Sequence, residues 1–210
     1  MFKHRSFRFA EKGTGGFLYD YMKWILASAS PRRKELLAEL VQEFDIIPAK
    51  GEERVPDGCS PRATVELLAK QKAKEICLTT QARGRAVLGA DTVVAFGQEI
   101  LGKPKDEEDA ARMLRLLSGK EHEVFTGVCI GIPNADGTHT YKVDSACTKV
   151  YFYPLTEMQI AAYIQSGSPM DKAGAYGIQD GGLVERIDGS FSNVVGLPLE
   201  LLAHMMQGIE

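Results

Sequence analysis

Residues 24–37 read WILASASPRRKELL, an apolar run that passes through small residues into a leucine-rich segment. The first four residues predict a short buried strand. Ser30 is a suitable N-cap, Pro31 suits the first helical turn, and leucines follow at helical spacing. The segment therefore predicts a strand, a tight turn and a helix, with backbone N–H groups exposed at the turn.

Strands and helices alternate along the rest of the chain. Apolar runs bounded by turn residues predict strands at 44–48, 86–96, 121–132 and 140–153, and a return strand in a hairpin after Gly97. N-cap residues and apolar residues at helical spacing predict helices at 61–79, 106–117, 157–165 and near the C-terminus. The region 166–196 contains seven glycines and is expected to form short strand-like pieces. This alternation indicates one α/β domain, with two lobes around a cleft.

The composition is that of an ordinary globular protein. The 210 residues include 25 Lys+Arg against 28 Asp+Glu, and 44% are apolar, which excludes a disordered, collagenous or coiled-coil chain. Four cysteines without a CxxC pair, and four histidines without HxxxH spacing, give no reason to expect structural zinc. Free thiols favour a reducing compartment, the cytoplasm, and no apolar run is long enough to span a membrane.

The N-terminus is basic. Residues 1–33 carry a net charge of +5, which leaves −8 on the remainder. Residues 1–22 are expected to form a flexible N-terminal arm, and the alternatives are a mitochondrial presequence or a cloning remnant. Binding of nucleic acid through this arm is not expected, because the net charge of the chain is −3 and no basic and aromatic patch repeats.

Arg32 and Arg33 begin the first predicted helix, where the helix dipole disfavours positive charge. Open N–H groups, the hydroxyls of Ser28 and Ser30 and two guanidinium groups predict a phosphate site. The alternative is that both arginines point into solvent or pair with glutamates on their own helix. Neither a Walker loop nor a dinucleotide-binding GxGxxG motif is present.

Asp91 interrupts the apolar strand 86–96. A buried carboxylate must be paired, hydrogen-bonded or bound to metal, and Lys103 on the returning hairpin is the expected partner. The alternative places Asp91 at the solvent end of the strand.

Three other polar segments are ambiguous when taken alone. The pair Glu52–Glu53 and the lysine-rich run 70–74 are typical of solvated surface. The stretch 170–179, MDKAGAYGIQ, either brings glycine backbone close to a ligand or forms a bulged strand and turn.

Several motifs in fixed order resemble those of the Maf family of nucleoside triphosphate pyrophosphatases. They are LASASPRRKELL (26–37), LGADTVV (88–94), LGKP (101–104), LSGKEHEVFTGV (117–128), MDKAGAYGIQ (170–179) and NVVGLPL (193–199). The resemblance runs from about Lys23 to the C-terminus. It implies that residues 23–210 form an elongated α/β domain with a twisted mixed sheet flanked by helices and a central cleft, similar to inosine triphosphate pyrophosphatases.

The resemblance implies a reaction. A nucleoside triphosphate is hydrolysed to a monophosphate and pyrophosphate with a divalent cation, Mg²⁺, Mn²⁺ or Co²⁺, and the protein is expected to be a homodimer. The implied substrates are dTTP, UTP and related or modified pyrimidine nucleotides. The implied roles are nucleotide-pool house-cleaning and cell-division control. The alternative is a nucleotide-binding regulatory protein without turnover, against which a complete set of charged motif residues argues.

The resemblance also assigns roles to residues. Asp91, Glu53 and Lys103 are the expected catalytic residues, with Asp91 and Glu53 also as metal ligands. Whether Asp91 is the general base or holds the metal stays open. Ser30, Arg33 and Lys72 are expected to bind phosphate. Arg32, Thr92 and Gln179 are the expected specificity residues. The amide of Gln179 can match the O4 and N3–H edge of uracil or thymine. Ser28, Asp171 and Lys172 are further candidates for the site.

Overall fold

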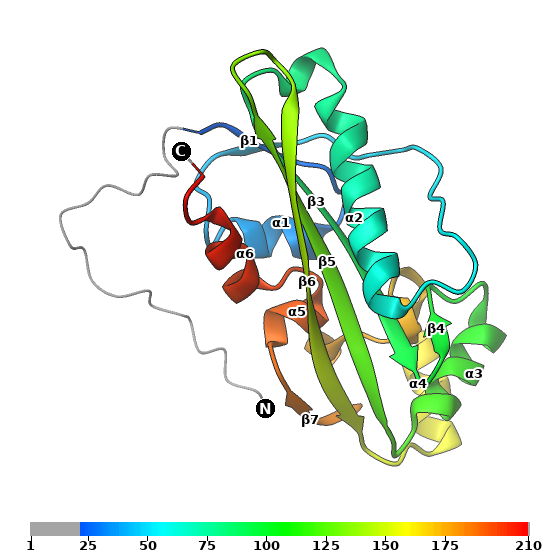
Figure 1. Ribbon diagram of the computed structural model, residues 1–210. Helices are drawn as coiled ribbons and strands as arrows, with labels where there is room; N and C mark the ends of the chain where they lie inside the picture. Colours follow the sequence, from blue (N-terminus) through cyan, green and yellow to red (C-terminus); the bar gives the residue numbers. More distant parts are fainter. Residues whose placement is uncertain (1–21, 210) are drawn as a thin grey trace, which may run out of the picture.

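A seven-stranded mixed β-sheet forms the centre of the molecule (Figure 1). The computed structural model describes residues 22–209. The strand order of the sheet is β2-β1-β3-β5-β6-β7. The seventh strand, β4, pairs with β3 and lies outside this order. β1 is parallel to β2 and β3, and the other pairs are antiparallel. The strands are β1 Trp24–Leu26, β2 Phe44–Ile46, β3 Ala86–Phe96, β4 Glu99–Leu101, β5 Glu121–Pro133, β6 His139–Phe152 and β7 Val184–Asp188.

Within residues 22–209, six α-helices connect or flank these strands. The predicted N-caps Ser30, Asp106 and Thr156 each accept a hydrogen bond from a backbone N–H of the first turn. Local sequence signals therefore determined where these helices begin. The helices are α1 Pro31–Leu37, α2 Pro61–Cys77, α3 Glu107–Leu117, α4 Glu157–Gln165, α5 Phe191–Val195 and α6 Leu199–Met206, and a 3₁₀ turn, η2, spans Thr80–Ala82.

Two apolar cores lie on opposite faces of the sheet. Helix α2 crosses one face, over β3, β5 and β6 (Figure 1). Gly89 and Gly127 allow this close contact, because a Cβ atom at either position would lie 2.3 Å from a backbone oxygen of α2. The larger core contains residues of α1, α3, α4, α5 and α6 on the other face. The mixed α/β class expected from the sequence is confirmed.

The glycine-rich region differs from the prediction of short strand-like pieces. Only β7 is a strand there, and the remainder consists of 3₁₀ turns, helix α5 and irregular segments between them. Gly174 and Ala175 have φ angles of +67° and +59°, and a strand cannot continue through left-handed backbone. The turns are η3 Ser168–Asp171, η4 Ala173–Ala175 and η5 Ile178–Asp180.

The edge of β3 is open over a short length. β1 pairs with residues 86–88 of β3, and β4 pairs with residues 94–96. Between them, residues 89–93 have no strand partner on that side within the described part of the chain. Side chains from both faces of β3 can therefore reach the space beside this edge.

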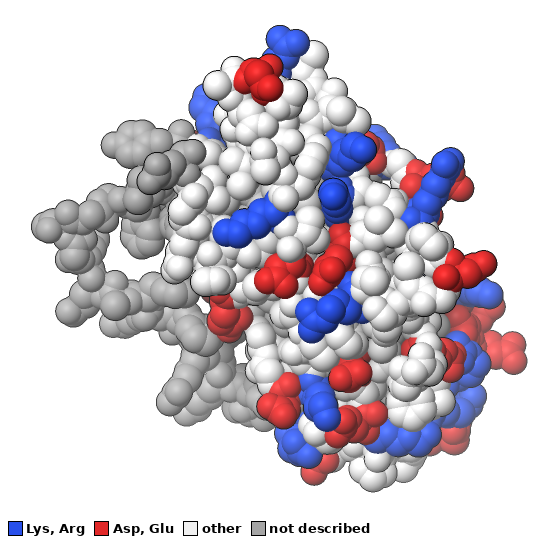
Figure 2. Space-filling view, viewed as in Figure 1, with Lys and Arg blue, Asp and Glu red and all other residues white. Residues whose placement is uncertain are grey.

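The long hairpin of β5 and β6 runs the length of the molecule and makes it elongated (Figure 1). Within residues 22–209 no helix has the length and apolar character needed to cross a membrane. Figure 2 shows Lys and Arg side chains interspersed with Asp and Glu on the face it presents. Apart from Met22, the predicted N-terminal arm lies outside the described residues.

Candidate functional site

A cavity of about 780 Å³ lies beside the open edge of β3. Its walls come from the turn after β1, the start of α1, the loop after β2, helix α2, the segment after β4 and the turns η3 to η5. All twelve predicted site residues line it. Five of its side chains are basic and three acidic, so its net charge suits a polyanion. The charged side chains are Arg32, Arg33, Lys72, Lys103, Lys172, Glu53, Asp91 and Asp171.

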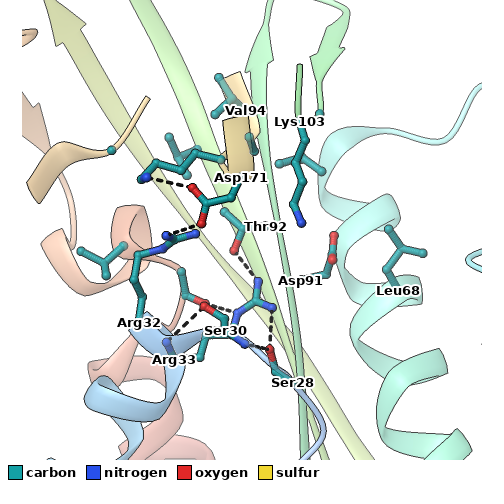
Figure 3. Close-up of a pocket in the computed structure, with 18 of the residues that line it drawn as sticks. Ser28, Ser30, Arg32, Arg33, Leu68, Asp91, Thr92, Val94, Lys103 and Asp171 are labelled. Atoms are coloured by element: carbon teal, nitrogen blue, oxygen red, sulfur yellow. Dashed lines mark hydrogen bonds and ion pairs between the residues drawn. The ribbon is translucent and has the colours of Figure 1, made fainter. Parts of the chain in front are cut away.

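The guanidinium group of Arg33 is anchored by three neighbours. Its Nε donates to the carbonyl oxygen of Gly196 at 2.9 Å, and its Nη1 donates to Ser28 Oγ at 3.3 Å. Its Nη2 donates to Thr92 Oγ1 at 3.0 Å (Figure 3). Burial lowers the pKa of Arg33 from its ordinary value, although Asp91 opposes this effect. Arg33 therefore neither points into solvent nor pairs with a glutamate of its own helix.

Thr92 belongs to a chain of hydrogen bonds in which the donor and the acceptor of each bond can be assigned. Its Oγ1 lies 3.0 Å from Thr126 Oγ1, and Thr126 donates to the carbonyl oxygen of Asn193 at 2.9 Å. A carbonyl only accepts, so the single hydroxyl hydrogen of Thr126 is used there. Thr92 must then donate to Thr126, and toward the cleft it presents an oxygen that accepts hydrogen bonds.

Asp91 and Glu53 converge on one ammonium group. Lys72 Nζ lies 2.5 Å from Asp91 Oδ1 and 2.9 Å from Glu53 Oε1. Asp91 is 9% exposed and lies within β3, not at its solvent end. Glu52 instead pairs with Arg54 at 2.9 Å. Of the two adjacent glutamates, therefore, Glu53 is the one that joins the cleft.

The expected pairing of Asp91 with Lys103 is wrong. Lys72 takes that place because α2 lies directly on the face of β3 that carries Asp91. Lys103 follows β4, and its side chain points into the cleft without an ion pair to any described residue (Figure 3). Its charge is thus available to a ligand.

The mouth of the cleft is bridged by an ion pair between distant parts of the chain. Arg32 Nη1 lies 3.0 Å from Asp171 Oδ2, and Lys172 Nζ lies 2.9 Å from the other oxygen of Asp171 (Figure 3). Burial raises the pKa of Asp171, but the hydrogen bonds from Lys172 and Arg32 outweigh it and lower that pKa overall. Arg32 and Asp171 thus join α1 to η3 across the opening.

Ser30 and Gln179 line the cleft from the start of α1 and from η5. Ser30 caps α1 by accepting from the N–H of Arg33, and its own N–H lies 3.2 Å from Ser28 Oγ. Gln179, in η5, is exposed at the cleft and forms no hydrogen bond with another residue in 22–209. Its amide is therefore free to contact a ligand.

The carboxylates of Asp91 and Glu53 fit a divalent cation with hard oxygen ligands. Both reach one position, which an ammonium ion occupies. Among residues 22–209 no group of three or more His, Cys, Asp or Glu side chains could hold a metal. Mg²⁺ is commonly bound by one or two carboxylates, and substrate phosphates and water fill its remaining coordination positions.

Sequence reasoning missed the groups that hold Arg33 in place. These are Thr126, the backbone of Asn193 and the carbonyl of Gly196. A signal for Thr126 was present: it is a hydroxyl residue between Val124 and Val128 on the core-facing side of β5. The two carbonyl groups left no trace in the sequence, because any residue supplies one.

The chain is similar to known proteins over nearly its full described length. Residues 23–209 match the family model described as Maf-like protein. It is 50% identical over 177 residues to the dTTP/UTP pyrophosphatase of Geobacillus sp. (strain WCH70), covering 83% of this chain and 91% of the relative. It is 47% identical over 189 residues to the dTTP/UTP pyrophosphatase of Aquifex aeolicus (strain VF5), covering 89% and 95%.

Two solved structures share the fold at low sequence identity. A HAM1 protein from Coxiella burnetii matches with a TM-score of 0.51 and 15% identity, over 88% of this chain and 98% of that one. The Ham1 protein of Staphylococcus aureus matches with a TM-score of 0.50 and 14% identity, over 90% and 100%. At such identity the likeness concerns the fold alone.

Proposed function

This chain belongs to the Maf-like protein family, and we propose that it hydrolyses nucleoside triphosphates, with dTTP and UTP as substrates, to a monophosphate and pyrophosphate. Its similarity to dTTP/UTP pyrophosphatases covers more than four fifths of the chain. The observation that carries the proposal is the convergence, in one cleft, of Arg33 and Lys103 with the group formed by Asp91, Lys72 and Glu53.

The basic side chains bind and orient the phosphates. A triphosphate brings about four negative charges, and phosphoryl transfer depends chiefly on positioning and charge stabilisation. Arg33, on α1, can hold a phosphate while its guanidinium group is anchored to Thr92 of β3, and Lys103 offers an unpaired ammonium group in the same cleft. Lys72 would be released to contact phosphate if its two partners, Asp91 and Glu53, held the cation.

Asp91 and Glu53 would hold the divalent cation, which supplies charge neutralisation and a more acidic water molecule. Asp91 is the buried one of the two and lies on the sheet, so its position is set more firmly than that of Glu53 on a loop. We assign to Asp91 the acceptance of the proton from the attacking water, and to Glu53 a supporting position at the cation.

We assign recognition of the base to Gln179, Thr92 and Arg32. The Gln179 amide offers a donor and an acceptor to the O4 and N3–H edge of uracil or thymine. Thr92 Oγ1 already accepts from Arg33, and its remaining lone pair can accept a further hydrogen bond from a bound nucleotide. Arg32 lies at the mouth, where its pairing with Asp171 closes one side of the site.

The bond that is cleaved tests the proposal. The protein is incubated with UTP or dTTP and Mg²⁺, Mn²⁺ or Co²⁺, and the products are separated by chromatography. Monophosphate and pyrophosphate are expected, and chelation of the cation should abolish turnover. Stepwise release of orthophosphate through a diphosphate would contradict the proposal.

The setting of the reaction stays a prediction. We place it in the cytoplasm, because the four cysteines are free thiols and a reducing compartment keeps them so. A homodimer without nucleic-acid partners is expected. Sedimentation of the full chain at several concentrations measures its mass, and a monomer at all concentrations would refute the dimer.

A further inference from the structure

We propose that Thr126 is a positioning residue that holds the guanidinium group of Arg33, through Thr92, in the direction needed to bind phosphate. This proposal rests on the proposed function for its biological meaning, but its test does not. Thr126 lies on β5 and is fully buried, so it cannot contact a ligand itself.

The direction of the hydrogen bonds carries the argument. Guanidinium groups only donate and carbonyl groups only accept, so both ends of the chain are fixed. Arg33 Nη2 donates to Thr92 at 3.0 Å, Thr92 donates to Thr126 at 3.0 Å, and Thr126 donates to the Asn193 carbonyl at 2.9 Å. Every hydroxyl hydrogen in the chain therefore has one orientation.

The framework behind Thr126 makes this orientation rigid. Thr126 is the cross-strand partner of Thr92, so the two hydroxyls lie side by side on one face of the sheet. Asn193 is also fully buried, and its side-chain amide donates to the Val124 carbonyl at 3.0 Å and to Thr148 Oγ1 at 2.9 Å. The accepting carbonyl at the end of the chain is thus held between β5, β6 and α5.

Loss of the Thr126 hydroxyl would release Thr92. The hydroxyl hydrogen of Thr92 would then have no acceptor in the core. The hydroxyl group would rotate to find one, and this rotation would weaken the hydrogen bond that Thr92 accepts from Arg33. The Nη2 side of the guanidinium group would lose its fixed acceptor, and only Ser28 and the Gly196 carbonyl would hold Arg33. A buried hydrogen-bonding group without a partner is costly, so such rearrangement is favoured.

The test measures binding of inorganic tripolyphosphate, which has no base and needs no turnover. Thr126→Val keeps the shape and removes the hydroxyl, and calorimetry should show about a fivefold to tenfold loss of affinity. Thr126→Ser restores the hydroxyl and should bind as the wild type does. For UTP, the valine variant should raise KM more than it lowers kcat.

Thr79→Val is the matched control. Thr79 follows α2, and its hydroxyl donates to the Ile76 carbonyl at 2.7 Å, but Thr79 neither lines the cleft nor bonds to Asn193. The control should lose some thermal stability and keep tripolyphosphate affinity. Unchanged affinity in Thr126→Val, or an equal loss in Thr79→Val, would overturn the proposal. A wild type that binds tripolyphosphate without cleaving UTP would overturn the proposed function alone.

Discussion

Asp91 is the residue to which we assign the central role in the reaction. It is buried on β3, and its counter-ion is the ammonium group of Lys72. A carboxylate in this position is costly to keep without a partner, so both the pairing and the location indicate a role in the reaction.

Asp91→Asn should retain the fold, because the amide has nearly the same shape, and should lower kcat by about 100-fold or more. Substrate binding should survive, since the phosphate-binding side chains are unchanged. Steady-state kinetics with UTP, together with circular dichroism, checks both points. A folded variant with near-normal kcat would leave Glu53 as the leading candidate for the catalytic group.

Lys72→Gln should increase the affinity for Mn²⁺ in the absence of substrate by about tenfold, because an ammonium ion no longer competes for Asp91 and Glu53. Electron paramagnetic resonance of free Mn²⁺ measures this directly. Lys74→Gln is the control, since Lys74 is on the same helix but outside the cleft. Equal Mn²⁺ affinity in both variants would show that the Lys72 ammonium group does not compete with the cation for Asp91 and Glu53.

Gln179→Ala should lower kcat/KM for UTP and dTTP by about 5- to 150-fold, because the base edge loses its partner. Purine triphosphates should change little. Arg33→Ala should instead weaken all triphosphates alike, since phosphate carries no base identity. A panel of UTP, CTP and GTP separates the two effects. An equal loss for all three in Gln179→Ala would remove Gln179 from the specificity residues.

At the level of elements, the contact of α2 with the sheet creates the site. Gly89 and Gly127 let the helix backbone rest directly on β3 and β5. The opposite wall depends on the turns η3 to η5, whose left-handed residues fold the chain back over the cleft. The site thus needs close packing on one side and irregular backbone on the other.

Gly89→Ala should lower the free energy of unfolding by about 1–3 kcal/mol, because the new Cβ would lie 2.3 Å from the Ala69 carbonyl oxygen and lift α2 from the sheet. Gly102→Ala is the control, since a Cβ there meets no atom within 4 Å. Urea unfolding compares the two variants. Similar midpoints would contradict the close contact of α2 with β3.

For the whole molecule, a buried histidine makes stability depend on pH. His122 packs edge-on against Phe152 and Tyr176, and its Nε2 lies 2.8 Å from the Tyr176 hydroxyl oxygen. Burial lowers the pKa of His122 from 6.5 to about 4. Between these values the unfolded chain binds a proton that the folded chain does not.

The unfolding free energy should therefore fall as the pH is lowered from 6.5 to 4, by about 3 kcal/mol from this residue. Above pH 6.5 the contribution is constant. His122→Gln keeps a hydrogen-bonding group and removes the titration, so its stability should vary less across this range. Urea unfolding at several pH values measures both slopes, and equal slopes would assign the effect to other groups.

Local order could be derived from the sequence, because its causes are local. The helix starts at Ser30, Asp106 and Thr156 and the hairpin after Gly97 each depend on residues within one turn of one another. Motif resemblance also named the cleft residues, although it could not show how they pair. The exception is the region 166–196, where glycines permit several local structures and packing selects the 3₁₀ turns.

The pairings within the cleft were decided only by the tertiary structure. Arg32 meets Asp171 139 residues away, and Thr92 meets Thr126 through the register of β3 with β5. Asp91 is neutralised by Lys72 rather than by Lys103, because direct packing of α2 on the sheet brings the helix lysine closer than the hairpin one. Such choices depend on strand register and packing distance between segments far apart in the chain, and no local pattern of residues encodes either quantity.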